Sequence, residues 1–131
     1  MYIQPRKNVI MDIKKQIIFL PTNDLKTTTH FYKNQINLEL FLDQGDCVIF
    51  KTCVNGYIGF CERPVNITEG KIILTFIVEN VDIVYEDFIS KANMEVSPPT
   101  TNQTYRIYHF FITDPNGYLI EFQKFLDEVS W

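Results

Sequence analysis

The 131-residue sequence lacks several features that would assign it to common classes of protein. No apolar run approaches the roughly 18 residues that a membrane helix needs, and no hydrophobic signal segment follows the N-terminus. No cluster of Lys and Arg exceeds two adjacent residues, and the formal net charge is −4. Nucleic acid and anionic membranes are therefore not expected as partners, and we expect a cytoplasmic protein.

The cysteines lack the C-x-x-C spacing of common zinc and redox motifs. Cys47, Cys53 and Cys61 lie within or beside apolar segments that are typical of strands, and the nearest histidine in the sequence is His30. We interpret them as reduced cysteines that pack as small hydrophobic side chains. A zinc site and a catalytic thiol are the alternatives.

The composition indicates a folded domain rich in strands. Hydrophobic residues make up 46% of the chain and charged residues 21%, which is typical of one globular domain. The 11 Phe and 7 Tyr favour strands and an aromatic-lined pocket. Residues 1–14 are polar and aperiodic, so we interpret them as an N-terminal extension before a single domain at 15–131.

The order of predicted elements is strand, helix and three strands, and this order occurs twice. Turn signals and apolar periodicity predict strands at 16–21, 38–43, 46–52, 57–62, 71–79, 94–96, 105–113 and 118–125. They predict helices at 22–35 and 81–93, and a loop at 97–104, where two prolines fall among polar residues.

Regular spacing between the two halves indicates an internal duplication. An offset of 56 residues pairs Ile17 with Ile73, Asp24 with Asn80 and Tyr32 with Phe88. The "NGY" at 55–57 recurs at 116–118 with an offset of 61, which fits a longer loop in the second half. The sequence therefore predicts an α+β fold of two βαβββ modules, at about 15–63 and 71–125.

Two segments carry a resemblance to a known family. "LPTNDLKTTTHFY" at 20–32 is similar to its opening strand and helix, and "DPNGYLIEF" at 114–122 is similar to its closing hairpin. The chain resembles the vicinal oxygen chelate superfamily, which includes glyoxalase I, extradiol dioxygenases, fosfomycin-resistance enzymes and bleomycin-resistance proteins. The resemblance implies a curved mixed sheet around a cavity, and a homodimer.

Metal-dependent members of that family hold a metal on the first and last strand of each module. Glu121 matches the ligand glutamate of the closing strand, whereas the other three positions fall on Ile17, Phe60 and Ile73. Those side chains carry no donor atom for a metal. We therefore expect no metal and no cofactor, and no glyoxalase, dioxygenase or fosfomycin-transferase chemistry at the family's usual metal position.

The predicted closing hairpin decides which side chains face the cavity. A four-residue turn at 114–117 would place Phe110 opposite Glu121 and turn His109 to the other face, in a structural role. His30 is expected to be partly exposed on the first helix. The side chains expected to line the cavity and bind a ligand are Glu121, Tyr108, Arg106, Phe110, Thr75, Phe19, Phe60 and Gln123.

Glu121 sits in an apolar strand, where an unpaired charge is unfavourable. It either pairs with Arg106 or has a raised pKa and stays neutral until a ligand arrives. Metal ligation and acid/base catalysis are further alternatives for this carboxyl group.

These observations favour a metal-free protein that binds a small molecule, similar to the bleomycin-resistance branch of the family. It would sequester an antibiotic or another planar or amphipathic metabolite. The alternative is a lyase or dioxygenase-like enzyme of the same fold, with a relocated metal site or with acid/base chemistry through Glu121 and either Tyr108 or His109.

Overall fold

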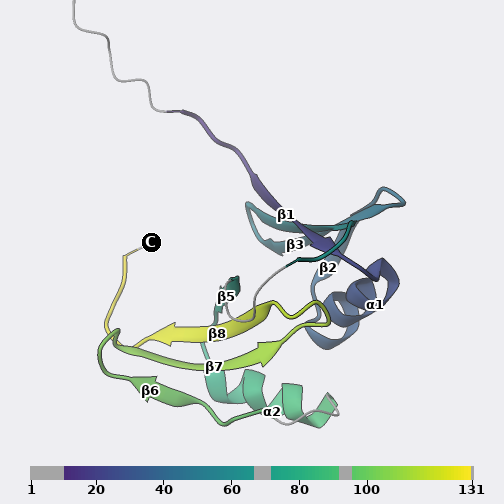
Figure 1. Ribbon diagram of the computed structural model, residues 1–131. Coiled ribbons are helices and arrows are strands. Elements are labelled where there is room, and N and C mark those ends of the chain that lie inside the picture. Colours follow the sequence, from purple (N-terminus) through teal and green to yellow (C-terminus); the bar gives the residue numbers. More distant parts are fainter. Residues whose placement is uncertain (1–10, 67–71, 92–95, 131) are drawn as a thin grey trace, which may run out of the picture.

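The computed structural model describes residues 11–66, 72–91 and 96–130, and its strands form two four-stranded sheets, each with helical segments on one side (Figure 1). The elements of the first module are β1 (Gln16–Thr22), α1 (Leu25–His30), the π-helical segment η1 (Phe31–Gln35), β2 (Glu39–Asp43), β3 (Cys47–Cys53) and β4 (Gly56–Glu62). Those of the second are β5 (Ile73–Ile77), α2 (Val81–Lys91), β6 (Thr100–Asn102), β7 (Ile107–Thr113) and β8 (Leu119–Phe125).

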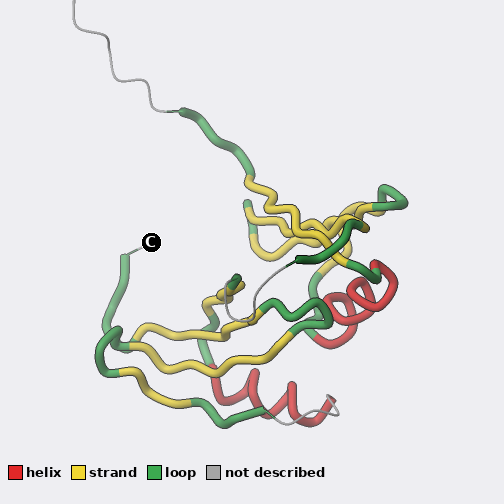
Figure 2. The backbone as a smooth tube through the Cα atoms, in the orientation of Figure 1, coloured by secondary structure: helices red, strands yellow, loops and turns green. Residues whose placement is uncertain are grey.

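The two sheets have the same topology. Their strand orders are β1-β4-β3-β2 and β5-β8-β7-β6, and in each the first strand runs parallel to the last and lies at the sheet edge. The α+β fold with two βαβββ modules is thereby confirmed. The sheets are separate and open (Figure 2).

Each helical region begins at a capping residue that the duplication predicts. The Asp24 carboxylate accepts a hydrogen bond from the backbone N–H of Thr27, and the Asn80 amide oxygen accepts one from that of Ile83. Such caps satisfy backbone donors that the first helical turn leaves unpaired. The predicted first helix at 22–35 is therefore shorter at its start than expected, and its second half is π-helical.

The core lies between each sheet and its own helical segment. Tyr32 contacts the ring of Phe60 at 4.5 Å between centroids, and Tyr85 of α2 contacts Phe110 at 5.4 Å. The strand side chains that belong to this core cluster come from alternate residues, namely Val48, Phe50, Ile58 and Phe60 in the first sheet and Phe110, Ile112, Ile120 and Phe122 in the second. The other residues of these strands point away from the helices; we call that side of each sheet its outer face.

The sequence was misread between α2 and β7. The edge strand β6 lies at Thr100–Asn102, inside the predicted loop, and pairs with β7 opposite His109, Tyr108 and Ile107. Of the strand predicted at 94–96, Met94 and Glu95 lie outside the described residues and Val96 is not in a strand. The β-branched pair Thr100–Thr101 is compatible with strand pairing once the prolines end.

The turn between β7 and β8 joins the two modules. Tyr32 donates a hydrogen bond through its hydroxyl to the Asp114 carboxylate at 2.8 Å, and the hydroxyl of Tyr118 donates one to the carbonyl oxygen of Pro21 at 2.7 Å. Asp114 also accepts hydrogen bonds from the backbone N–H groups of Asn116 and Tyr118, both at 2.8 Å. Burial and the neighbouring Asp114 raise the pKa of Tyr32 and of Tyr118, so both remain neutral donors.

A second polar group strengthens this connection. Thr22 and Thr28 are fully buried, and their hydroxyls lie 2.8 Å apart. The Asn116 amide oxygen lies 2.7 Å from the Thr22 hydroxyl, and its nitrogen lies 3.0 Å from the Thr28 hydroxyl. Among the described residues no buried side-chain nitrogen or oxygen is left without a partner, so this polar contact costs little desolvation.

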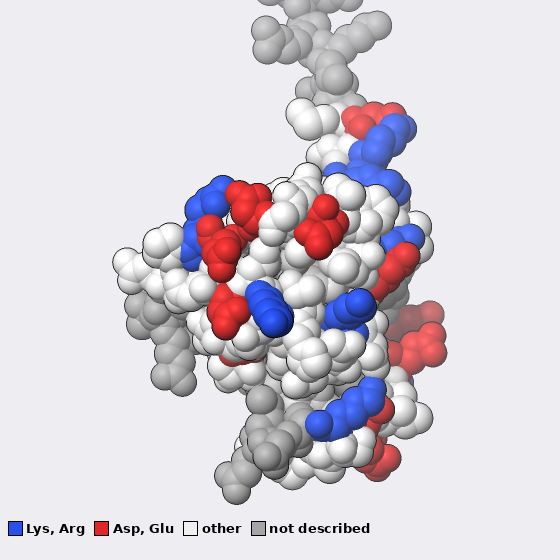
Figure 3. All heavy atoms as spheres, turned by 90° about the vertical axis from the view of Figure 1, so that its right-hand side faces the viewer, with Lys and Arg blue, Asp and Glu red and all other residues white. Residues whose placement is uncertain are grey.

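Charged side chains are intermixed over the face shown in Figure 3. Lys and Arg lie beside Asp and Glu there, and neither sign gathers into a large patch. In the part of the chain that the structure describes, no helix is long and apolar enough to cross a membrane.

Candidate functional site

Glu121 lies on the outer face of the second sheet, but its neighbours differ from those predicted. In the β7–β8 ladder Thr113 pairs with Leu119, so Glu121 lies opposite Phe111 and not opposite Phe110. Tyr118 belongs to the connection, where its backbone is bound by Asp114 and its hydroxyl binds the carbonyl oxygen of Pro21, so the connection is one residue longer than predicted. A one-residue change of register turns every side chain to the other face. The prediction that His109 points away from Glu121 was therefore wrong.

Three side chains meet on this outer face. Nδ1 of His109 lies 2.6 Å from one Glu121 carboxylate oxygen, and the Thr75 hydroxyl donates a hydrogen bond to the other at 2.8 Å. They come from three neighbouring strands, because Thr75 pairs with Glu121 across β5–β8 and Gln123 pairs with His109 across β7–β8. We call Thr75, His109 and Glu121 the carboxylate cluster.

The carboxylate cluster keeps Glu121 ionised although its side chain is buried. Burial alone raises the pKa of Glu121, but hydrogen bonds from His109, Thr75 and Gln123 lower it by more, so the pKa lies below its ordinary value. The alternative of a raised pKa is therefore wrong. The pairing with Arg106 is also wrong, because Arg106 binds Asp127 at 3.1 Å and lies away from Glu121.

Three further predicted site residues are not on the outer face. Phe60 and Phe110 are buried in the core, and Tyr108 extends from the helix side of the sheet to donate a hydrogen bond to Asp82 of α2. Phe60 was misplaced because the "NGY" repeat is out of step with the strands by one residue. Ile17 pairs with Tyr57 and Ile73 with Leu119, so the residue equivalent to Glu121 is Gly59.

Phe19, Thr75 and Gln123 do lie on outer faces. Phe19 covers Gly59, since a Cβ on Gly59 would approach the Phe19 ring to 2.4 Å. Thr75 and Gln123 flank Glu121. Their roles in ligand binding stay predictions.

Two of the cysteines form a disulfide, which corrects the prediction that all three are reduced. Cys47 and Cys61 lie directly opposite each other in the β3–β4 ladder and are bonded, whereas Cys53 is free and exposed. The predicted strands at 46–52 and 57–62 form a hairpin that brings these two residues opposite each other. That hairpin was the signal that the sequence offered for this bond.

The family's metal position does not fit a metal in this chain. The four equivalent residues are Ile17, Gly59, Ile73 and Glu121, and both carboxylate oxygens of Glu121 already have partners. One carboxylate does not provide the donor set that a divalent ion needs. Elsewhere in the described residues, no three His, Cys, Asp or Glu side chains are placed to share an ion.

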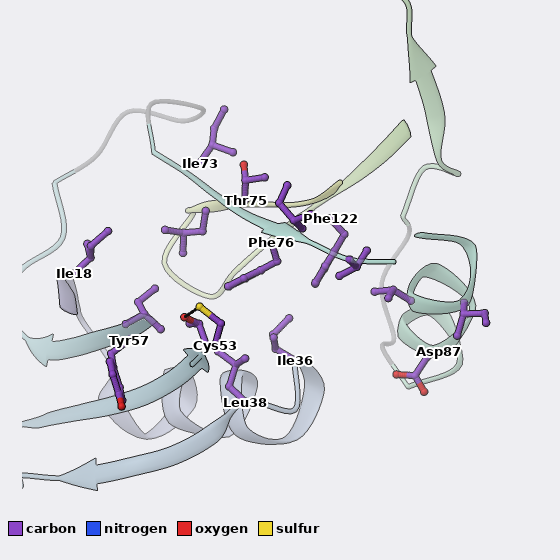
Figure 4. A pocket seen from close by; sticks show the side chains of 17 residues that line it. Ile18, Ile36, Leu38, Cys53, Tyr57, Ile73, Thr75, Phe76, Asp87 and Phe122 are labelled. Carbon is purple, nitrogen blue, oxygen red and sulfur yellow. Dashed lines mark hydrogen bonds between the residues drawn. The ribbon is translucent and has the colours of Figure 1, made fainter. Parts of the chain in front are cut away.

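A pocket of about 910 Å³ lies between the modules (Figure 4). Ile18, Tyr57 and Cys53 approach it from the first module, and Ile73, Thr75 and Phe76 approach it from β5 of the second. Its lining is mainly apolar, with Thr52, Cys53, Thr75 and Asp87 as the polar contributors. Because Thr75 also binds Glu121, the pocket adjoins the carboxylate cluster.

His109 was expected in a structural role on the opposite face because its direction depends on the hairpin register alone. Its side chain is largely buried against Glu121 and meets the ring of Phe111 edge-on at 5.1 Å. A histidine and a glutamate on adjacent strands were visible in the sequence, but only the five-residue connection brings them together.

Comparison with known proteins agrees with this fold. A model of the glyoxalase/bleomycin resistance protein/dioxygenase superfamily matches residues 15–122. No curated protein sequence matches the chain.

Several solved structures share the fold at low sequence identity. A glyoxalase/bleomycin resistance protein/dioxygenase from Nocardioides is 16% identical, with a TM-score of 0.73 over 94% of this chain and 89% of that one. An integron cassette protein from the mobile metagenome of the Halifax Harbour sewage outfall is 20% identical, with a TM-score of 0.71 over 84% and 97%. A lactoylglutathione lyase from Agrobacterium tumefaciens is 21% identical, with a TM-score of 0.66 over 91% and 95%.

Proposed function

This chain belongs to the glyoxalase/bleomycin resistance protein/dioxygenase superfamily, and we propose that it binds a small, mostly apolar molecule without the help of a metal. The apolar part of the ligand occupies the pocket between the modules. Its polar part reaches the carboxylate cluster on the outer face of the second sheet. An antibiotic and another planar or amphipathic metabolite both have this chemistry.

The pocket beside Thr75 is the observation that carries this proposal. A volume of about 910 Å³ accommodates a drug-sized molecule, for which binding cavities of about 300–1,000 Å³ are usual. Apolar walls favour burial of a hydrophobic ligand, and a few fixed polar groups give it an orientation. Thr75 supplies the link between the two parts of the site.

A neutral fluorescent probe tests the proposal directly. N-phenyl-1-naphthylamine brightens on transfer from water to an apolar site, so we expect wild-type protein to bind it with saturation. Ile83→Lys places a charge on the pocket wall, whereas Ile89→Lys places one at an exposed position of the same helix outside the pocket. We expect Ile83→Lys to weaken binding at least tenfold and Ile89→Lys to leave it unchanged. Equal affinities for the two variants would contradict the proposal.

We further propose a homodimer. Isoleucines at the free edges of the sheets are exposed, with Ile17 at 41%, Ile18 at 50%, Ile73 at 49% and Ile77 at 45%. Burial of such surface between chains stabilises association. Light scattering at micromolar concentration should give twice the 15.5 kDa mass of one chain, and the monomer mass would contradict the dimer.

We also propose a cytoplasmic location. The state of the disulfide tests this proposal. Bonds such as Cys47–Cys61 persist mainly in oxidising compartments. In a reducing cytoplasm these two cysteines would be thiols, and alkylation of intact cells followed by mass spectrometry distinguishes the two states.

The alternative function is an enzyme of the same fold. The contact between Glu121 and His109 favours it, because a carboxylate that orients an imidazole is a common arrangement in acid/base catalysis. An enzyme of this fold could also use a relocated metal site, and elemental analysis of purified protein tests that form of the alternative. Near-equimolar zinc, nickel, manganese or iron after dialysis would contradict the metal-free proposal.

A further inference from the structure

His109 is held so that its two ring nitrogens have different partners. Nδ1 lies 2.6 Å from Glu121, whereas Nε2 makes no hydrogen bond with any described residue. Among the described residues, no side-chain nitrogen or oxygen that is buried from solvent lacks a hydrogen-bond partner. Because Nε2 has no such partner, it is not buried from solvent. It is therefore accessible from the outer face of the second sheet.

The carboxylate cluster determines which nitrogen carries the proton in the neutral ring. An ionised carboxylate only accepts hydrogen bonds, so Nδ1 must donate to Glu121. The other oxygen of Glu121 accepts the Thr75 hydroxyl, which fixes the plane of the carboxylate. A neutral imidazole with its proton on Nδ1 has a free lone pair on Nε2, and that atom is an acceptor.

The surroundings of His109 favour an aromatic ligand. The ring of Phe111 lies beside it, 5.1 Å away between centroids, and 39% of the Phe111 residue is exposed. Thr75 and Ile77 on β5 line the pocket and lie two strands away from β7, which is roughly 10 Å. A molecule of two fused rings covers most of this distance once its van der Waals surface is included.

We propose that Nε2 of His109 accepts a hydrogen bond from a hydroxyl group of the ligand, and that the ligand is an aromatic alcohol whose rings lie between Phe111 and the pocket. This inference rests on the proposed function, since it assigns a chemical class to the molecule that the pocket holds. Glu121 and Thr75 act as positioning residues for the imidazole.

The tautomer can be measured without any ligand. The chain contains two histidines, His30 and His109, and Nδ1 of His30 lies 2.9 Å from the side-chain amide nitrogen of Asn34. An amide nitrogen only donates, so neutral His30 must carry its proton on Nε2. At mildly alkaline pH, ¹⁵N NMR of the rings should show opposite tautomers for the two residues. A proton on both nitrogens of His109, or on Nε2 alone, would overturn the proposal.

A matched pair of ligands tests the role of the hydroxyl. 1-Naphthol can donate a hydrogen bond and 1-methoxynaphthalene cannot, although both present the same rings. We expect wild-type protein to bind 1-naphthol about tenfold more tightly, as one net hydrogen bond gives. His109→Phe keeps an aromatic ring and should remove this preference. His109→Gln can donate to Glu121 and still offer an oxygen acceptor, so it should restore part of it.

The outcomes separate the two claims. If wild-type protein binds both compounds equally, the pocket is a binding site and the hydroxyl acceptor is wrong. If it binds neither, the proposed function fails together with the inference. If His109→Phe is unfolded in a thermal melt, His109→Gln and the tautomer measurement still decide the role of Nε2.

Discussion

The two modules have the same backbone and similar cores, but their outer faces differ. Phe60 and Phe122 occupy equivalent buried positions, as do Ile58 and Ile120. On the outer face, Gly59 covered by Phe19 in the first module corresponds to Glu121 bound by Thr75 in the second. The duplicated chain has therefore kept the residues that pack its sheets and has changed those that face outward.

The outer faces of the two sheets also differ on the next strand, β3 in the first module and β7 in the second. Cys47 pairs with Cys61 across β3–β4, and His109 pairs with Gln123 across β7–β8 at the equivalent positions. A covalent crosslink thus stands in the first module where a histidine stands in the second. The difference supports a structural role for the first outer face and the proposed ligand site on the second.

The largest effect is expected at the turn that joins the modules. Asp114→Ala leaves the buried hydroxyl of Tyr32 and the N–H of Tyr118 without their acceptor, at about 1–3 kcal/mol each. We expect the free energy of unfolding to fall by about 2–6 kcal/mol in urea denaturation.

The matched control is the equivalent turn of the first module. Asn55 accepts an exposed hydrogen bond from Lys15, so Asn55→Ala should change the free energy by less than about 0.5 kcal/mol. Similar losses in both variants would show that the two turns do not differ as described.

The disulfide should contribute next. A crosslink that closes a short loop typically stabilises a domain by about 2–4 kcal/mol, so replacing Cys47 and Cys61 together by serine should lower the melting temperature. A reducing agent should lower that of the wild type in the same way. Cys53→Ser is the control, because that thiol is free, and it should melt as the wild type does with and without reductant.

The packing of Phe19 on Gly59, on the outer face of the first sheet, can be tested by substitution. Gly59→Ala places a methyl group against the Phe19 ring, and overpacking of this kind costs about 1–3 kcal/mol. Combining it with Phe19→Ala should remove the clash, so a double-mutant cycle should show strong coupling. Additive losses would mean that Phe19 does not lie over Gly59.

The smallest effect concerns the pH dependence of stability. The folded pKa of Glu121 lies below its unfolded value, so its contribution is complete above about pH 4.3 and is lost as the pH falls through the folded pKa. Glu121→Gln should lower the free energy of unfolding by about 1 kcal/mol near neutral pH, because neutral hydrogen bonds replace charged ones. It should also make that free energy depend less on pH in the acid range. Glu39→Gln, at an exposed position of β2, should leave both unchanged. If the free energy of unfolding of the wild type falls no more steeply in acid than that of Glu121→Gln, the carboxylate is not ionised as described.

Much of the fold could be predicted because its signals are local. Alternation of apolar residues marks the strands, and Asp24 and Asn80 mark the helix starts at the spacing of the duplication. The edge strand β6 escaped prediction because it is short, polar and stabilised by its partner β7 alone.

The candidate site could be predicted only in part, because it depends on register. The sequence singles out Glu121, but its partners follow from the position of Tyr118, whose hydroxyl binds Pro21 in the other module. This contact joins residues far apart in the chain and accompanies a hairpin register one residue away from the predicted one. That shift replaces Phe110 and Arg106 by Phe111 and His109 around Glu121.

The central claim is that the outer face of the second module and the adjoining pocket bind the ligand. Amide chemical-shift mapping of the wild-type protein during titration with 1-naphthol tests it most directly. The account predicts that the largest shifts fall on β5, β7 and β8, with smaller ones on α2 at the pocket wall. Shifts confined to the outer face of the first module, around Phe19 and Gly59, would contradict it.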